Sequence, residues 1–219
     1  MDERDILQIF AILQENKKQW QDSTLESLGK EPFLVLIACL LSLRTQDQLT
    51  RQVSERLFRV VSTPQQILNL TEEELIQLIY PVGFYRRKAH NILIISRILL
   101  EKYQGQVPST LEELLALPGV GRKTANLVLT VGFGRLGICV DTHVHRIVNR
   151  WGYVKTKSPD KTEMALREKL PSEYWIPINS VLVLFGQNIC LPRRPRCDQC
   201  PIENYCDKIS VEFMGIKKK

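Results

Sequence analysis

The stretch "TLEELLALPGVGRKTANLVL" at residues 110–129 places two apolar helical patterns on either side of a proline–glycine turn. Pro118 ends the first helix, and the segment from Gly119 to Gly121 makes a tight turn with backbone dihedrals that suit glycine. A P-loop for a free nucleotide needs G-x-x-x-x-G-K-[ST] between a buried strand and a helix, and neither the spacing nor the context is met here. The stretch therefore predicts a helix–hairpin–helix.

We expect the amide groups of this turn and of the following helical turn to form a site for one backbone phosphate of a DNA strand. Glycines, which have no side chain, let the strand come close. A helix-linking turn without a ligand is the alternative, and the Leu-Pro-Gly-Val-Gly order followed by basic residues favours DNA. The DNA contacts predicted in this segment are Pro118, Gly119, Val120, Gly121, Arg122 and Thr124.

Helical spacing continues through the rest of the 219 residues. Thr71 with Glu74, and Ser109 with Glu112, have the spacing of capping boxes. Ser158, directly before a proline, has the position of an N-cap. The sequence offers no convincing pair of alternating strands joined by a hairpin turn. We therefore predict an all-α fold.

The chain carries a net charge of +6 and a pI near 9.0, which suits a polyanionic partner without specifying one. Its longest apolar run, residues 33–43, is too short to span a membrane. The charged N-terminus does not resemble a secretory signal. We expect a monomeric cytoplasmic protein, nucleoid-associated if prokaryotic, with no membrane partner.

Four of the six cysteines crowd into "CLPRRPRCDQCPIENYC" at residues 190–206, with the spacing C-x6-C-x2-C-x5-C. Such clustering in a chain without an export signal indicates a metal site and not disulfides. Four thiolates can hold either Zn²⁺ or a [4Fe–4S] cluster, and the presence of a single C-x2-C pair favours the cluster only modestly. The predicted ligands are Cys190, Cys197, Cys200 and Cys206.

The loop between the first two of these cysteines is strongly basic, with Arg193, Arg194 and Arg196. A loop pinned by a metal site and carrying three arginines is suited to contact backbone phosphates, and solvated surface charge is the alternative. The two remaining cysteines, Cys39 and Cys139, stand alone in apolar segments, where we expect them to be buried.

The motifs "LPGVGRKTAN" (117–126) and "VDTHVHR" (140–146), followed by the cysteine cluster, resemble the endonuclease III branch of the helix–hairpin–helix DNA glycosylases. The resemblance covers nearly the whole chain, in the family's order and spacing. It implies two helical domains with DNA between them. Residues 25–135 would form a six-helix domain with the hairpin, and residues 1–24 with 136–219 a domain holding a [4Fe–4S] cluster.

The resemblance also implies a lysine nucleophile at Lys123 and a catalytic carboxylate at Asp141. A lysine attacks only when deprotonated, and the positive helix end and Arg122 both disfavour its ammonium form. Attack at the sugar C1′ would displace a flipped base, and the imine would permit β-elimination. Phosphate binding by Lys123 and simple helix capping by Asp141 are the alternatives that the residues alone leave open.

The sequence "DTHVH" also suggests a D-x-H-x-H metal site. On a helix, however, Asp141 and His145 share a face and His143 does not. Since no third ligand is evident, we discount a catalytic metal. We assign His143 and His145 to the DNA-binding residues, as support or phosphate contacts.

One departure from the family pattern concerns the glutamine that fills the gap left by the flipped base. This chain reads "LLSLRTQD" at 40–47, so Arg44 takes that place and Gln46 lies two residues further on. We include both among the predicted DNA contacts, and the loop at 81–87 could insert from the other side. The departure puts the preferred lesion and partner base in doubt.

These observations favour a bifunctional glycosylase and abasic-site lyase that removes oxidised pyrimidines from double-stranded DNA containing damaged bases or abasic sites. A mismatch glycosylase that removes thymine or adenine is the alternative within the class, although the catalytic lysine argues against a monofunctional enzyme. A non-catalytic iron–sulfur DNA-binding protein is the alternative outside it.

Overall fold

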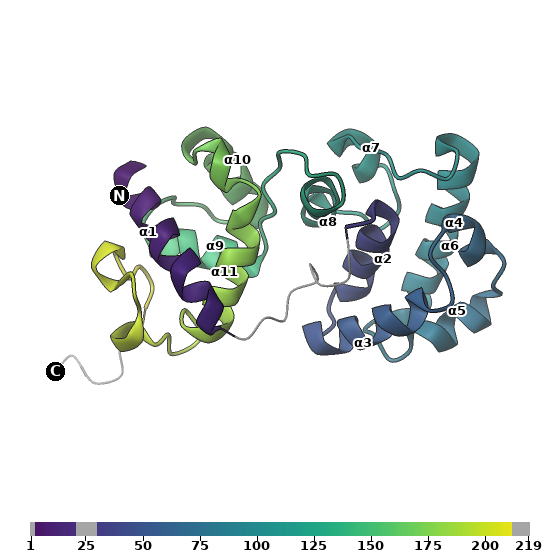
Figure 1. Ribbon diagram of the computed structural model, residues 1–219, viewed down its shortest axis with the longest axis horizontal. Helices are drawn as coiled ribbons and strands as arrows, with labels where there is room; N and C mark the ends of the chain where they lie inside the picture. Colours follow the sequence, from purple (N-terminus) through teal and green to yellow (C-terminus); the bar gives the residue numbers. More distant parts are fainter. Residues whose placement is uncertain (1–2, 21–29, 212–219) are drawn as a thin grey trace. The chain divides into compact units, whose positions relative to one another are not determined.

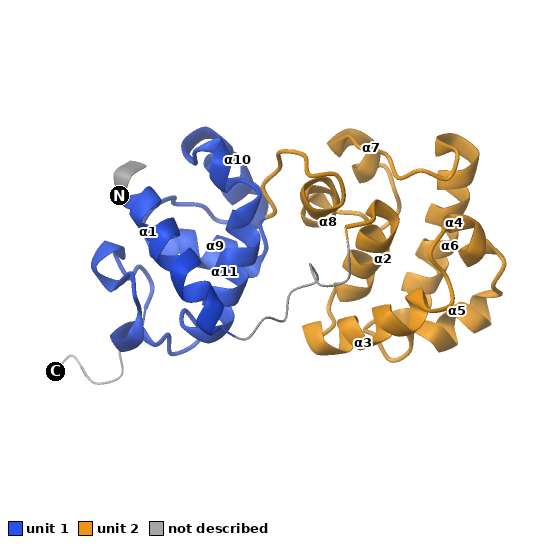
Figure 2. Ribbon diagram, in the orientation of Figure 1, with its two compact units in different colours: residues 1–22, 140–219 blue, residues 23–139 orange. Residues whose placement is uncertain are grey.

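The computed structural model describes residues 3–20 and 30–211, and all regular secondary structure in these ranges is helical (Figure 1). The chain divides into two compact units (Figure 2). Unit 1 contains residues 1–22 and 140–219, and unit 2 contains residues 23–139. In the described ranges no helix is both long and apolar enough to cross a membrane.

Unit 2 is organised around one apolar helix, α2 (Pro32–Ser42), in which eight of the nine residues from Phe33 to Leu41 are buried. Its neighbours in contact are α3, α6, α8 and the π-helical turn η3. The helices of the unit that follow α2 are α3 (Asp47–Phe58), α4 (Pro64–Leu68), α5 (Glu72–Ile79), α6 (Tyr85–Tyr103), α7 (Leu111–Leu115) and α8 (Arg122–Leu127), which continues into η3 (Val128–Gly132).

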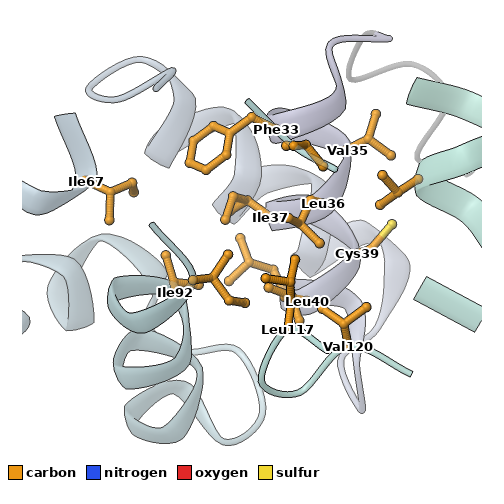
Figure 3. Close-up of a cluster of buried hydrophobic side chains, with 14 of the residues drawn as sticks. Phe33, Val35, Leu36, Ile37, Cys39, Leu40, Ile67, Ile92, Leu117 and Val120 are labelled. Carbon is orange, nitrogen blue, oxygen red and sulfur yellow. The ribbon is translucent and has the colours of Figure 1, made fainter. Parts of the chain in front are cut away.

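The core of unit 2 explains why α2 carries almost no polar residue. Figure 3 shows side chains of α2 in one apolar cluster with Ile67, Ile92 and Leu117 from other parts of the unit. Each fully buried aliphatic side chain contributes about 1.5–3 kcal/mol of transfer free energy. The hairpin is fixed to this core through Val120, which belongs to the same cluster.

Helix caps confirm two of the predicted starts and correct a third. Thr71 and Glu74 form the predicted capping box of α5, and the side chain of Ser158 caps α10 (Pro159–Lys169). The prediction of Ser109 as a cap with Glu112 is wrong by one residue. The side chain of Thr110 accepts from the amide of Glu113 at 3.3 Å, and α7 begins after it.

Unit 1 contains a smaller group of helices: α1 (Glu3–Asn16), α9 (Thr142–Arg150), α10 and α11 (Pro177–Asn188). α9 contacts both α10 and α11, and α1 contacts α11. Aromatic side chains fill the spaces between them, with Phe10 against Tyr174 and Trp151 near Phe185. α9 is therefore packed between α10 and α11, and this packing fixes the position of the helix and of its N-terminus.

Candidate active site and nucleic-acid interface

The hairpin turn depends on glycine at one of its two glycine positions. Gly119 has φ +77°, and a Cβ there would lie 2.7 Å from Nδ2 of Asn91. Gly121 has an extended backbone (φ −98°), and a Cβ there would meet nothing within 4 Å. The expectation of glycine-specific dihedrals therefore holds for Gly119 and is wrong for Gly121, whose exposed position leaves room for a ligand instead.

Lys123 is the second residue of α8, directly after the turn, and its side chain is exposed. Thr124 beside it is buried, as is Val120. Neither of these two predicted DNA contacts presents a side chain to the surface, and the amide of Val120 donates within the turn to the carbonyl oxygen of Leu117 at 3.2 Å. DNA contact by either residue stays a prediction. The hairpin therefore holds a lysine at the surface of unit 2, directly after the turn.

Two buried cysteines lie beside Lys123 within unit 2. The thiol of Cys139 donates to the carbonyl oxygen of Lys123 at 3.7 Å. Burial raises the pKa of Cys39 to about 12, against the opposing effect of the nearby Lys123 charge. Both cysteines are buried, as the sequence predicted, and Cys139 contacts α8 directly.

Asp141 is the N-cap of α9 and lies in unit 1. Its carboxylate accepts hydrogen bonds from the backbone amides of His143 (2.8 Å) and Val144 (2.9 Å). The side chain is 8% exposed. The predicted cap is therefore confirmed, and it holds the carboxylate in one orientation.

The two histidines of α9 make hydrogen bonds inside unit 1. His145 Nδ1 lies 2.6 Å from Oγ1 of Thr162, and His143 Nδ1 lies 3.2 Å from a guanidinium nitrogen of Arg146. Arg146 also donates to the carbonyl oxygen of Cys190 at 2.7 Å. The histidines thus support α9, and phosphate contacts by either remain a prediction.

The segment around Arg44, where the sequence departs from the family pattern, contains a residue with a left-handed backbone conformation, and so does the loop that carries Phe84. Arg44, two residues beyond the end of α2, has φ +53°, and Phe84, the N-cap residue of α6, has φ +56°. A non-glycine residue in this left-handed region costs about 1–2 kcal/mol. Both side chains are exposed, and the Arg44 guanidinium lies 5.7 Å from the centre of the Phe84 ring. Gln46 is the exposed N-cap residue of α3.

A cavity of about 520 Å³ lies beside this segment in unit 2. It reaches from Arg44 and Phe84 to Gly119 of the hairpin. Its other lining residues are Leu40, Leu43, Arg87, Lys88 and Asn91. Sequence reasoning missed Phe84 and Lys88 as individual residues, although it identified the loop that contains Phe84.

The four predicted ligands, Cys190, Cys197, Cys200 and Cys206, line a single cavity in unit 1, and none of them forms a disulfide. Within the described ranges no three His, Cys, Asp or Glu side chains form a site for one metal ion. The lining of this cavity thus includes four thiols, the donor set of an iron–sulfur cluster. Buried Arg150 donates to Cys190 Sγ at 3.4 Å and to the carbonyl oxygens of Leu191 and Pro192.

The thiol chemistry also fits an iron–sulfur cluster. Burial raises the pKa of Cys200 to about 12, and it raises the pKa of Cys197 and of Cys206 as well. Neighbouring thiols add to each shift, because thiolates so close together repel one another. Bound iron would offset this repulsion and keep all four sulfurs deprotonated.

We expect Cys200→Ser to lose the visible absorbance of the cluster and most of the iron, against about four irons per chain in the wild type. Cys39→Ser, which changes a buried cysteine outside the cavity, should keep its iron. Iron analysis with visible spectroscopy checks both. Full iron content in the Cys200 variant would show that this thiol is not a ligand.

The arginines of the cysteine loop, Arg193, Arg194 and Arg196, are all exposed. Arg196 also lines the cavity of the thiols, and its amide donates to the carbonyl oxygen of Ile189 at 3.0 Å. The loop therefore presents positive charge to solvent from an anchored backbone. That arrangement suits the predicted phosphate contacts, which remain a prediction.

The family model of HhH-GPD superfamily base excision DNA repair proteins matches residues 37–172. The chain belongs to this superfamily. A second model, the iron–sulfur binding domain of endonuclease III, matches residues 190–206, which begin and end at Cys190 and Cys206. The chain is 54% identical to endonuclease III of Thermotoga maritima over 81% of its own length and 83% of that protein. It is 41% identical to the enzyme of Haemophilus influenzae over 93% and 97%.

The fold of this chain is also similar to that of solved endonuclease III structures. A non-covalent endonuclease III–DNA complex matches with a TM-score of 0.82 and 38% identity, covering 92% of this chain and 95% of that one. A trapped endonuclease III–DNA covalent intermediate matches with the same TM-score and 39% identity over the same shares. The predicted family, the all-α fold, the glycosylase and lyase class and the [4Fe–4S] cofactor are confirmed.

Proposed function

We propose that this enzyme removes oxidised pyrimidines from double-stranded DNA and then cuts the strand at the resulting abasic site. The observation that carries the proposal is that Lys123 is exposed at the start of α8, directly after the hairpin turn for which we propose phosphate binding. A strand anchored by the turn's amides would bring one sugar close to the amine. The covalent intermediate trapped between DNA and a relative supports this chemistry.

The reaction begins when the damaged base leaves the duplex, at a cost of a few kcal/mol of stacking and pairing. The lone pair of Lys123 Nζ attacks C1′, and the N-glycosidic bond breaks, so that the base leaves with the bonding electrons and takes up a proton. Opening of the sugar ring gives an imine between Nζ and C1′. Asp141 stabilises the positive charge that develops on the sugar and assists proton transfer.

Strand cleavage follows from the imine. Loss of a C2′ proton sends electrons toward the imine, and the C3′–O bond breaks on the 3′ side of the sugar. Hydrolysis of the imine then frees Lys123 and the cut DNA. The cluster supplies no step, and we assign it to holding the arginine loop for phosphate contact.

The flipped base leaves a gap in the duplex, and we propose that the segment around Arg44, which differs from the family pattern, fills it. Arg44 and Phe84 are exposed, adjacent and held in strained backbone conformations, which is typical of functional positions. We propose that Arg44 enters the gap and bonds the orphaned partner base while Phe84 packs against the stack. We further propose that the enzyme acts as a cytoplasmic monomer.

A panel of duplexes tests this function. We expect excision of thymine glycol and dihydrouracil at least about tenfold faster than excision from T·G or A·8-oxoguanine pairs, as the proposed preference for oxidised pyrimidines requires. Single-turnover rates on matched sequences measure the difference. Faster excision of a mismatched thymine or adenine would establish the mismatch alternative instead.

A further inference from the structure

Lys88 is a buried cation in unit 2 whose role the proposed mechanism leaves open. It lies in the first turn of α6 and is 8% exposed. Its Nζ donates to the carbonyl oxygens of Leu41 and Leu43, both at 2.7 Å, and to Oγ1 of Thr45 at 3.1 Å. The three N–H groups of the Lys88 ammonium thus each have one acceptor. All three acceptors belong to the segment that carries Arg44.

The end of α2 explains why a cation is useful there. The last carbonyl groups of a helix have no partner within the helix and form its negative end. Helices commonly end with a glycine in the left-handed region, and here Arg44 occupies that region (φ +53°). The ammonium group of Lys88 bonds the carbonyl oxygens of Leu41 and Leu43 at this helix end, directly before Arg44.

The loop that carries Phe84 is joined to the same segment. The amide of Gly83 donates to Oγ1 of Thr45 at 3.1 Å, so this hydroxyl contacts both loops. A Cβ at Gly83 would collide with the carbonyl oxygen of Arg44, which shows how closely the two backbones approach. Arg44 and Phe84 are therefore presented by two loops fastened at Thr45, with Lys88 beneath them.

We infer that Lys88 is a positioning residue, which fixes Arg44 and Phe84 in the geometry needed to fill the gap left by the flipped base. This inference rests on the proposed gap-filling role of Arg44. Lys88 acts through the loop and does not touch the reacting sugar. It lines the 520 Å³ cavity together with two other cations, Arg44 and Arg87, and the described residues around that cavity include no carboxylate.

Burial lowers the pKa of Lys88 to about 8. Below that pH the side chain is an ammonium with three N–H groups, one for each acceptor in the loop. A buried charge is costly without polar partners, so the three hydrogen bonds are what stabilise it at this position.

Single-turnover kinetics on two substrates test the inference, with Lys88→Met, Lys88→Arg, Arg44→Ala and the double variant Lys88→Met/Arg44→Ala. One duplex carries dihydrouracil and the other a preformed abasic site, which has no base to unstack. We expect Lys88→Met to slow dihydrouracil excision about tenfold and cleavage at the abasic site less than about twofold. Lys88→Arg, which keeps the charge, should recover part of the loss.

The double variant asks whether Lys88 acts through the segment that carries Arg44, in which case its loss should be smaller than the product of the two single-variant losses. Lys102→Met, an exposed lysine on the same helix, is the matched control and should behave as the wild type. Equal losses on both substrates, or additive losses in the double variant, would overturn the inference. Normal excision by Arg44→Ala would overturn both the gap-filling role of Arg44 and the inference about Lys88. Slow excision by Arg44→Ala together with normal excision by Lys88→Met would overturn only the inference about Lys88.

Discussion

Lys123→Ala is expected to abolish borohydride trapping on abasic DNA and to lower the single-turnover rate of base excision by at least about 10³-fold. The reason is that the variant has no amine to form the covalent bond to C1′. Lys123 is exposed at the start of α8, so truncating its side chain creates no cavity in the core. We therefore expect a folded protein with its visible absorbance intact.

Arg122→Ala provides the matched comparison, because it removes a positive charge from the adjacent residue of the same hairpin. We expect it to weaken DNA binding and to reduce the salt dependence of affinity by about one unit of slope, while the trapped adduct still forms at saturating enzyme. Trapping by the Lys123 variant at the wild-type level would contradict the nucleophile assignment. It would favour a phosphate-binding role for this lysine.

The hairpin and the cysteine cluster could be predicted from the sequence because each is formed by residues close together in the chain. Proline and glycine end and turn a helix within a few residues, and the apolar spacing on both sides belongs to the same short stretch. The cap of α7 shows the limit of this reasoning. Ser109 and Thr110 are both capping residues followed at the right distance by a glutamate, and only the folded backbone selects Thr110.

Long-range contacts account for what the sequence did not reveal. Lys88 follows two arginines and reads as a surface residue, yet its partner Leu41 lies 47 positions earlier in the chain. The left-handed backbone conformation of Phe84 could not be predicted from the sequence either, because the neighbouring Gly83 is the residue expected to adopt it. Gly83 is needed instead for close approach to Arg44, which only tertiary packing creates.

Asp141→Asn separates catalysis from capping, because asparagine is about as good an N-cap as aspartate. The two amides that Asp141 accepts from can both bond an asparagine oxygen, so α9 should remain in place. Loss of the negative charge at the helix N-terminus should cost about 0.3–1 kcal/mol of stability. If the carboxylate stabilises the positive charge on the sugar, as proposed, its loss should also slow base excision by about 10²–10³-fold.

Ser158→Ala is the control for this prediction, since Ser158 caps α10 in the same unit and its loss should cost about 0.5–2 kcal/mol. That variant should therefore be destabilised as much as Asp141→Asn or more, and yet excise the base at the wild-type rate. Thermal unfolding and single-turnover excision, measured on both variants, give the comparison. If excision falls in proportion to stability in both, Asp141 acts only as a cap. If it falls in Asp141→Asn alone, the cap serves to aim a carboxylate that takes part in the reaction.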